Sequence, residues 1–302
     1  MSRVFVVGSI NMDVVAITER HPRPGETVSG TELHFVPGGK GANQAVAAHR
    51  ADAETVMVGR LGEDDFGAQL EAFLRAEGLD LAHMGREAEL PTGTALVTVA
   101  GSQNTIVVVA GANGALSADE ALALPFTSED VVVAQFEVPL ETVEAALRHG
   151  RRQGATTMLN PSPTQECPPG LLGQADVLVV NEIELAFLAS VGETALESDD
   201  DVAAAARTLR ARESQLIVTT LGDAGVLALD RDEVIRVEGR PVEAVDSTGA
   251  GDCFTGNLAA ELSRSAPVSA ALETANVAAS LCVQSFGAGV SMPRWAEVRD
   301  AV

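Results

Sequence analysis

Short β-branched segments alternate with helical segments along most of this chain, and this alternation restricts the fold more than any other feature. "DVVVAQFE", "TTMLNPSP" and "ADVLVVN" are typical of buried strands, and "PLETVEAALRHGRRQG" is typical of a helix that ends at glycine. Strands that alternate with helices form a mainly parallel sheet with helices on both faces. The sequence therefore predicts one α/β domain over residues 1–302.

Two regions depart from this alternation. "DVVAIT" and "ETVSGTELHFV", which begins at Glu26, alternate apolar and polar residues, as strands with one wet face do. "GTALVTVAGSQNTIVVVAGAN" has the pattern of two strands around the turn "GSQN", which predicts a hairpin. We expect these strands, at about 12–36 and 93–110, to form a separate small β-sheet that projects as a lid.

The composition excludes several classes of partner. The chain has 43 acidic and 20 basic residues, a net charge of −23, whereas nucleic-acid phosphates and anionic lipids attract clustered bases. Cys167, Cys253 and Cys282 are odd in number and widely spaced, which argues against a disulfide framework or a zinc site. The N-terminus lacks the features of a signal peptide, and no apolar stretch reaches the roughly 18 residues of a membrane span. We expect a cytoplasmic protein with no nucleic-acid or membrane partner.

The stretch "DSTGAGDCF" combines a glycine-rich turn with the beginning of a helix. Gly249, Ala250 and Gly251 lack bulk, so the N–H groups of this turn can approach an anion closely. Asp252 then has two interpretations that the residues leave open. It is either the N-cap of the helix, or a base that takes the proton of an attacking hydroxyl while the turn holds the transferring phosphoryl group.

The stretch "GGKGAN" contains the single lysine of the chain, Lys40, in a sequence with nineteen arginines. It is neither a phosphate-binding GxxxxGK[ST] motif nor a GxGxxG dinucleotide fingerprint. A compact ammonium suits a tight phosphate or sugar site better than a planar guanidinium does. The alternative is that these glycines form only a tight turn between a strand and a helix.

The chain resembles the PfkB carbohydrate-kinase family, and within it the ribokinase-like members. The motifs that carry the resemblance are, in order, "VGSINMD", "GGKGANQAVAA", "VGRLGEDDFG", "AGANGALS", "NPSP", "VVNEIE", "VTTLGDAG", "DSTGAGDCFTG" and "FGAGVSMP". They extend over nearly the whole chain, and the pairing of the second with the eighth is highly specific. The resemblance implies a ribokinase-like α/β fold with a β-sheet lid, ATP and Mg²⁺ as co-reactants, activation by K⁺, and a homodimer formed through the lid.

The resemblance also implies a role for individual residues. The sugar would be bound by Asn11, Asp13, Gly39, Lys40, Gly41, Ala42, Asn43, Glu137 and Asp252, and catalysis would use Asp252 with the anion hole Gly249, Ala250 and Gly251. The nucleotide, its phosphates and Mg²⁺ would contact Asn181, Glu184, Thr220, Leu221, Gly222, Asp223, Ala224, Gly225, Gly251 and Asn276. The monovalent cation would be held, mostly through backbone oxygens, by Asp246, Thr248, Cys282, Ser285, Gly287 and Ser291. For Asn181 and Glu184 the alternative is an ordinary helix start with acids in its first turn.

The reaction implied by the resemblance is transfer of the ATP γ-phosphoryl group to the 5-hydroxyl of D-ribose. Asn11, Asp13, Asn43 and Glu137 favour ribose within the family. Another PfkB kinase, acting on fructose, deoxyribose or a nucleoside, is the nearest alternative. A non-catalytic sugar or nucleotide sensor is a third alternative, but a sensor would be expected to have lost Asp252 or a glycine of its turn.

Overall fold

The computed structural model describes residues 2–101 and 103–302, and within them the larger of two sheets has nine strands. Their order is β13 (Glu233–Glu238), β12 (Gly225–Asp230), β11 (Leu216–Thr220), β10 (Val177–Asn181), β9 (Thr156–Asn160), β8 (Val131–Gln135), β1 (Arg3–Val7), β4 (Glu54–Gly62) and β5 (Asp80–Glu87). All neighbours from β11 to β5 are parallel, whereas β12 and β13 pair in antiparallel fashion. The predicted mainly parallel sheet is therefore confirmed.

Helices cover both faces of this sheet. One face carries α1 (Lys40–Arg50), α2 (Asp65–Glu77), α7 (Ala250–Ser263), α8 (Val268–Cys282) and α9 (Trp295–Ala301); the other carries α3 (Ala118–Leu122), α4 (Leu140–Gln153), α5 (Glu182–Leu188) and α6 (Asp199–Leu209). Alternate residues of β1 point to opposite faces of the sheet and belong to two apolar cores: Val4 and Val6 lie in one, and Phe5 and Val7 in the other. None of the described helices is long and apolar enough to cross a membrane.

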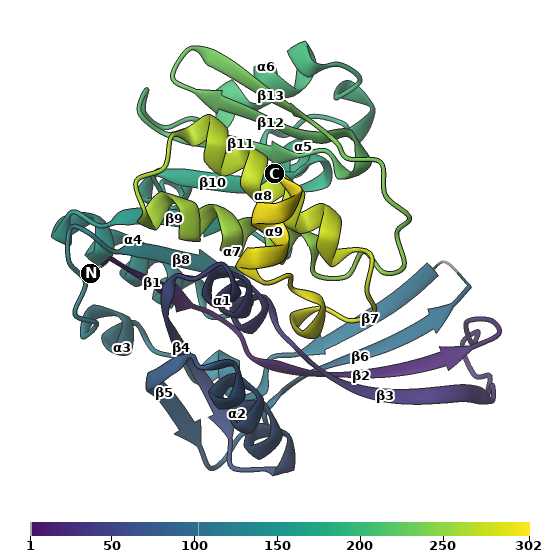
Figure 1. Cartoon of the computed structure of the whole chain (residues 1–302). Helices are drawn as coiled ribbons and strands as arrows, with labels where there is room; N and C mark the ends of the chain where they lie inside the picture. Colours follow the sequence, from purple (N-terminus) through teal and green to yellow (C-terminus); the bar gives the residue numbers. More distant parts are fainter. Residues whose placement is uncertain (1, 102) are drawn as a thin grey trace.

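The second sheet has four strands in the described chain, in the order β3 (Gly30–Gly38), β2 (Asn11–Thr18), β6 (Gly93–Ala100) and β7 (Gln103–Val109). β2 pairs with β6 in parallel, and the outer pairs are antiparallel. Figure 1 shows these strands extending away from the main sheet on the side of α1 and α7. The separate small sheet is thus confirmed, and Ser102 of the predicted "GSQN" turn lies outside the described residues.

Both edges of the main sheet escaped prediction, because neither β5 nor β13 has the long apolar run of a central strand. The strand predicted at 26–36 is present with different bounds, since β3 begins at Gly30 and continues through Pro37 to Gly38. Gly30 pairs with Thr18, the last residue of β2, so residues before Gly30 have no partner strand. Pro37 is tolerated because β3 is an edge strand.

Close contact between α1 and two other segments sets the geometry of the site. A Cβ on Gly41 would lie 2.5 Å from the carbonyl carbon of Gly8, just beyond β1. A Cβ on Gly256, in α7, would lie 2.5 Å from both the Cβ of Ala47 and the carbonyl oxygen of Gln44. These glycines let the first turns of α1 and α7 meet near the carboxyl end of β1, which is where ligands bind in open α/β sheets.

Candidate active site

A cavity of about 690 Å³ is lined by the lid strands, the beginning of α1 and the segment that leads into α7. Of the predicted sugar-binding residues it is lined by Asn11, Asp13, Gly39, Lys40, Asn43, Glu137 and Asp252. The other two, Gly41 and Ala42, are buried in the first turn of α1 and do not line the cavity. The cavity therefore joins residues from the first 43 positions to a carboxylate more than two hundred positions later.

Asp252 lies in the first turn of α7 and is only 6% exposed. Its Oδ2 accepts a hydrogen bond from Asn43 Nδ2 at 2.9 Å, and its Oδ1 accepts one from Gln44 Nε2 at 2.9 Å. The N-cap of α7 is Gly249, with φ of 80°, and not Asp252. The interpretation of Asp252 as a capping residue is therefore wrong, and its carboxylate is directed at α1.

The first turn of α7 presents backbone donors beside this carboxylate. The N–H of Ala250 donates to Ser247 O at 3.2 Å, and that of Cys253 donates to Gly249 O at 2.7 Å. In the described part of the chain, the N–H groups of Gly251 and Asp252 then have no acceptor in this turn. A Cβ on Gly251 would meet no heavy atom within 4 Å, so an anion has room to approach these donors.

Glu137 connects the start of α1 to the strand end at β1. Its Oε2 accepts hydrogen bonds from Ser9 Oγ at 2.5 Å, from the backbone N–H of Lys40 at 3.1 Å and from Asn11 Nδ2 at 3.4 Å. All three bonds use the same carboxylate oxygen, and the residue lines the cavity. Oε1 takes no part in these bonds, so it is available to a ligand hydroxyl.

Asn113 orients the side chain of Asn11 and was not predicted. Its Oδ1 accepts from the backbone N–H of Ile10 at 2.9 Å, which directs its Nδ2 to Asn11 Oδ1 at 2.7 Å. Asn113 is buried in the 3₁₀ turn Gly111–Ala115, within the motif "AGANGALS". The motif was visible in the sequence, but only the packing reveals that the side chain of Asn113 reaches Asn11.

Carboxylates outnumber basic side chains around the cavity, and the pKa values of Asp13 and Lys40 are shifted. Burial, followed by the charges of Glu137 and Asp252, raises the pKa of Asp13 from 3.8 to about 7. Burial would lower the pKa of the Lys40 ammonium, but Asp252, Glu137 and Glu184 outweigh it and raise that pKa. The single lysine thus supplies the positive charge that this group of carboxylates requires.

The predicted nucleotide residues do not line this cavity. Asn181 and Glu184 form a capping box at the start of α5, so the alternative of an ordinary helix start describes their local structure. The run Thr220–Gly225 forms the turn between β11 and β12, with positive φ at Gly222 and Gly225. Asn276 lies on α8 and donates to Glu238 O at 2.9 Å. Among the described residues no side-chain hydrogen bond joins these groups to Asp252, whose carboxylate accepts from Asn43 and Gln44.

The predicted cation residues divide into two groups. Asp246, Thr248 and Gly287 line the cavity, and Asp246 joins their loops by accepting from Thr248 N at 2.9 Å and from Gly287 N at 3.0 Å. Cys282, Ser285 and Ser291 do not line it; Cys282 is fully buried, and its Sγ lies 3.1 Å from Ser291 Oγ. Among described residues no group of three or more His, Cys, Asp or Glu could hold a metal ion. One carboxylate without histidine or thiolate ligands beside it in the cavity lining is not the ligand set of a transition-metal site.

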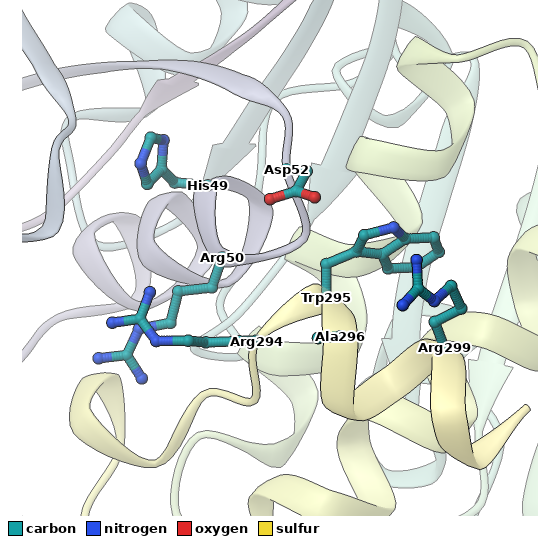
Figure 2. Close-up of a pocket in the computed structure, with 7 residues that line it drawn as sticks. All are labelled: His49, Arg50, Asp52, Arg294, Trp295, Ala296 and Arg299. Carbon is teal, nitrogen blue, oxygen red and sulfur yellow. The ribbon is translucent and has the colours of Figure 1, made fainter.

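A second hollow, of about 330 Å³, lies at the far end of α1 and against α9. Figure 2 shows His49 and Arg50 from α1 and Trp295 and Arg299 from α9 around it. The guanidinium of Arg50 is already engaged by Glu77 and by the carbonyls of the 290–292 segment. This hollow contains none of the candidate catalytic residues.

Comparisons with known proteins agree with this geometry. The profile of the pfkB family carbohydrate kinases matches residues 1–295. The chain is 37% identical over 302 residues to a ribokinase of Bacillus subtilis (strain 168), with 99% of each protein covered. It is 33% identical over 297 residues to a deoxyribokinase of Salmonella typhi, with 96% of this chain and 95% of the relative covered.

Solved structures give the same result for the fold. The structure of Arabidopsis thaliana ribokinase complexed with ribose and ATP matches with a TM-score of 0.89 at 30% identity. The match covers 100% of this chain and 99% of the plant protein. The fold is therefore ribokinase-like, and the chain belongs to the pfkB family of carbohydrate kinases.

Proposed function

We propose that this protein transfers the γ-phosphoryl group of ATP to the 5-hydroxyl of D-ribose, with Asp252 as the general base. One observation carries the proposal: Asp252 lines the same cavity as Asn11, Asp13 and Asn43, and the free N–H groups of Gly251 and Asp252 lie beside its carboxylate. A hydroxyl bound in that cavity meets a proton acceptor on one side and an anion-binding turn on the other.

The carboxylate of Asp252 accepts the proton of the sugar hydroxyl as the hydroxyl oxygen attacks the γ-phosphorus in line. Asn43, which lines the cavity, donates from Nδ2 to Oδ2 of this carboxylate and so helps to orient it. The N–H groups of Gly251 and Asp252 stabilise negative charge on the transferring group, and Gly251 leaves the space for it. The breaking bond joins the γ-phosphorus to the oxygen that leaves with ADP.

The charge of the cavity supports a neutral polyol as the acceptor. Asp13, Glu137 and Asp252 all line it, and carboxylates read hydroxyl groups but repel a substrate that is already phosphorylated. Ribose rather than another sugar is supported by the ribokinases among the relatives. A deoxyribokinase relative at 33% identity makes deoxyribose the specific competitor.

We propose Mg²⁺ and K⁺ as further requirements. When bound with ATP, Mg²⁺ neutralises charge on the phosphates; Glu184, whose electrostatic influence extends to Lys40, is the residue here that would hold it with Asn181. K⁺ would be held at the loops that Asp246 joins, beside the turn that begins α7. Thr220, Gly222, Gly225 and Asn276 would contact the nucleotide.

The first test of this proposal is Asp252→Asn. General-base assistance contributes about 10²–10⁴-fold, so we expect kcat to fall at least about 100-fold while calorimetry still detects sugar binding. Asp65→Asn, at an exposed position in α2, is the matched control and should keep full turnover. Near-normal kcat in Asp252→Asn would refute the assignment of the base.

The second test is a coupled ADP-release assay with ribose, deoxyribose, fructose and adenosine, with and without K⁺. We expect ribose to give the highest kcat/KM and K⁺ to raise turnover. If another acceptor gives a higher kcat/KM than ribose, the proposed substrate would be that acceptor and not ribose. Sugar binding without ADP release for any acceptor would support the non-catalytic sensor instead.

We further propose a homodimer formed through the lid, from a chain that is otherwise one α/β domain. All seven residues of β7 are exposed, including Ile106 and Val107 at 53% and 61%. An exposed apolar edge strand is stabilised when another chain covers it.

A further inference from the structure

Gln44 is a fully buried residue that the scheme above has not used for catalysis. It follows Asn43 in α1, and the two amides divide the carboxylate of Asp252 between them: Asn43 donates to Oδ2 and Gln44 to Oδ1, each at 2.9 Å. Unlike Asn43, Gln44 does not line the cavity. Its bond to Asp252 is therefore made from behind, on the side away from the substrate.

The orientation of the Gln44 amide follows from its neighbours. Asn160 Nδ2 donates to the backbone carbonyl of Val179 at 2.9 Å, so Asn160 must turn its Oδ1 the other way. That oxygen accepts from Gln44 Nε2 at 3.2 Å. Gln44 Oε1 then faces Gln135, whose Nε2 donates to it at 2.7 Å. The backbone carbonyl of Val179 thus sets the orientation of the Asn160 amide. Because Asn160 then accepts from Gln44, the Gln44 amide presents its Nε2 donor to Asp252 and not its oxygen.

The hydrogen-bonded amides of Gln44, Gln135 and Asn160 cost folding free energy that an apolar residue at position 135 would not. Gln135 is fully buried, and its Oε1 has no hydrogen-bond partner within the described residues. Leaving a buried carbonyl unpaired costs about 1–3 kcal/mol. The position following β1 must also be glycine, since a Cβ on Gly8 would lie 2.0 Å from that Oε1. An apolar residue at 135 would avoid the unpaired carbonyl.

We infer that Gln44 is the positioning residue of Asp252, held by Gln135 and Asn160 so that its Nε2 keeps the carboxylate oriented for proton transfer. This inference rests on the proposed function, in which Asp252 is the base. Gln44 does not line the cavity, so it acts only through Asp252.

The test compares kcat–pH profiles of Gln44→Glu and Gln44→Met with the wild type. Glutamate keeps the shape but places a second carboxylate beside Asp252, so the pair retains a proton to higher pH. We expect the acid limb of kcat to move up by about one pH unit or more, with kcat at pH 7 down about tenfold. Sugar KM should change less than about threefold, because Gln44 does not line the cavity and the residues that would bind the sugar are unchanged. Methionine removes the donor without adding charge, so its shift should be smaller but in the same direction.

Gln135→Glu changes a residue that contacts Gln44 and not Asp252, so it tests the next hydrogen bond of the network. Its carboxylate cannot donate to Gln44 Oε1, so the Gln44 amide turns over and presents oxygen to Asp252. We expect the same upward shift of the acid limb. Gln69→Glu, an exposed site on α2 with the same change of charge, is the matched control and should leave the profile unmoved.

Thermal unfolding of each variant shows whether it is folded. If Gln44→Glu does not fold, the kcat–pH profile of Gln44→Met decides the test. An unmoved acid limb in folded Gln44 variants, with Asp252→Asn inactive, would overturn the positioning role and leave the base assignment standing. Normal turnover by Asp252→Asn would instead overturn the proposed function, and this inference with it. A shifted limb together with inactive Asp252→Asn supports both.

Discussion

At the scale of single residues, Asp13 lines the candidate site at a cost in stability. Burial, Glu137 and Asp252 raise its pKa to about 7, whereas the unfolded chain has 3.8. The folded protein therefore holds a proton on Asp13 at pH values where the unfolded chain has released it. By linkage, the stability that Asp13 contributes is complete below about pH 4 and is lost as the pH rises to about 7.

Asp13→Asn should reverse this effect, because asparagine cannot ionise. We expect the gain in unfolding free energy over wild type to be larger at pH 8 than at pH 5 by about 1–2 kcal/mol, after discounting for solvent screening. Urea denaturation of the sugar-free protein at both pH values measures it, with Asp65→Asn as control. An equal effect of Asp13→Asn at both pH values would contradict the raised pKa.

The same variant should weaken sugar binding. A carboxylate is a charge-assisted acceptor for hydroxyl groups, and asparagine is not. Calorimetric sugar affinity of the wild type should rise between pH 6 and pH 8, as Asp13 loses its proton. In Asp13→Asn the affinity should be lower and no longer vary with this ionisation.

At the scale of elements, the site depends on how closely α7 approaches α1. Gly256 is the point of contact, with Ala47 and the carbonyl of Gln44 within 2.5 Å of the position that a Cβ would occupy. One turn earlier in α7, Asp252 receives its hydrogen bonds from Asn43 and Gln44. A larger residue at 256 should therefore separate Asp252 from the amides of Asn43 and Gln44.

We predict that Gly256→Ala destabilises the protein by about 1–3 kcal/mol, through overpacking, and also lowers kcat per folded molecule. Urea denaturation and steady-state kinetics measure the two effects. Gly150→Ala in α4 is the matched control, because a Cβ there would lie 2.9 Å from Val132 on the other face of the sheet. Gly150→Ala should lower the free energy of unfolding but leave kcat unchanged. Equal kcat per folded molecule in Gly256→Ala and Gly150→Ala would show that the spacing of α1 and α7 at Gly256 does not affect Asp252.

At the scale of the whole molecule, the lid leaves apolar surface without cover. Ile106 and Val107 are neighbours in β7 and point to opposite faces of the lid sheet, and Ile106 lines the cavity while Val107 does not. The proposed dimer would bury one of these faces or both. The wild-type protein should therefore sediment as a dimer.

Ile106→Lys and Val107→Lys distinguish the two faces. The variant on the covered face should shift sedimentation towards the monomer, because the ammonium would be buried without a partner. Val234→Lys, at an exposed apolar position on β13, the edge of the main sheet, is the control and should remain dimeric. A wild-type protein that sediments only as monomer would remove the proposal.

The sequence alone determined the class of fold and the two segments that matter most. Buried parallel strands such as β8 and β10 are continuous apolar runs, and a helix start after glycines is visible in "GGKGAN" and "DSTGAGD". These are local signals, so they can be recognised without knowing what packs against them. β5 and β13 lack such signals, because an edge strand is defined largely by the neighbour that it pairs with.

The tertiary structure alone decided which side chains act together. No local pattern indicates that Gln44 reaches Asp252 across 208 positions, or that Asn113 orients Asn11. The pKa of Asp13 likewise depends on two carboxylates that come from distant elements. Hydrogen bonds and charges act through space over a few ångströms, whereas sequence patterns report only on neighbours along the chain, and for this reason the network around the base had to come from the fold.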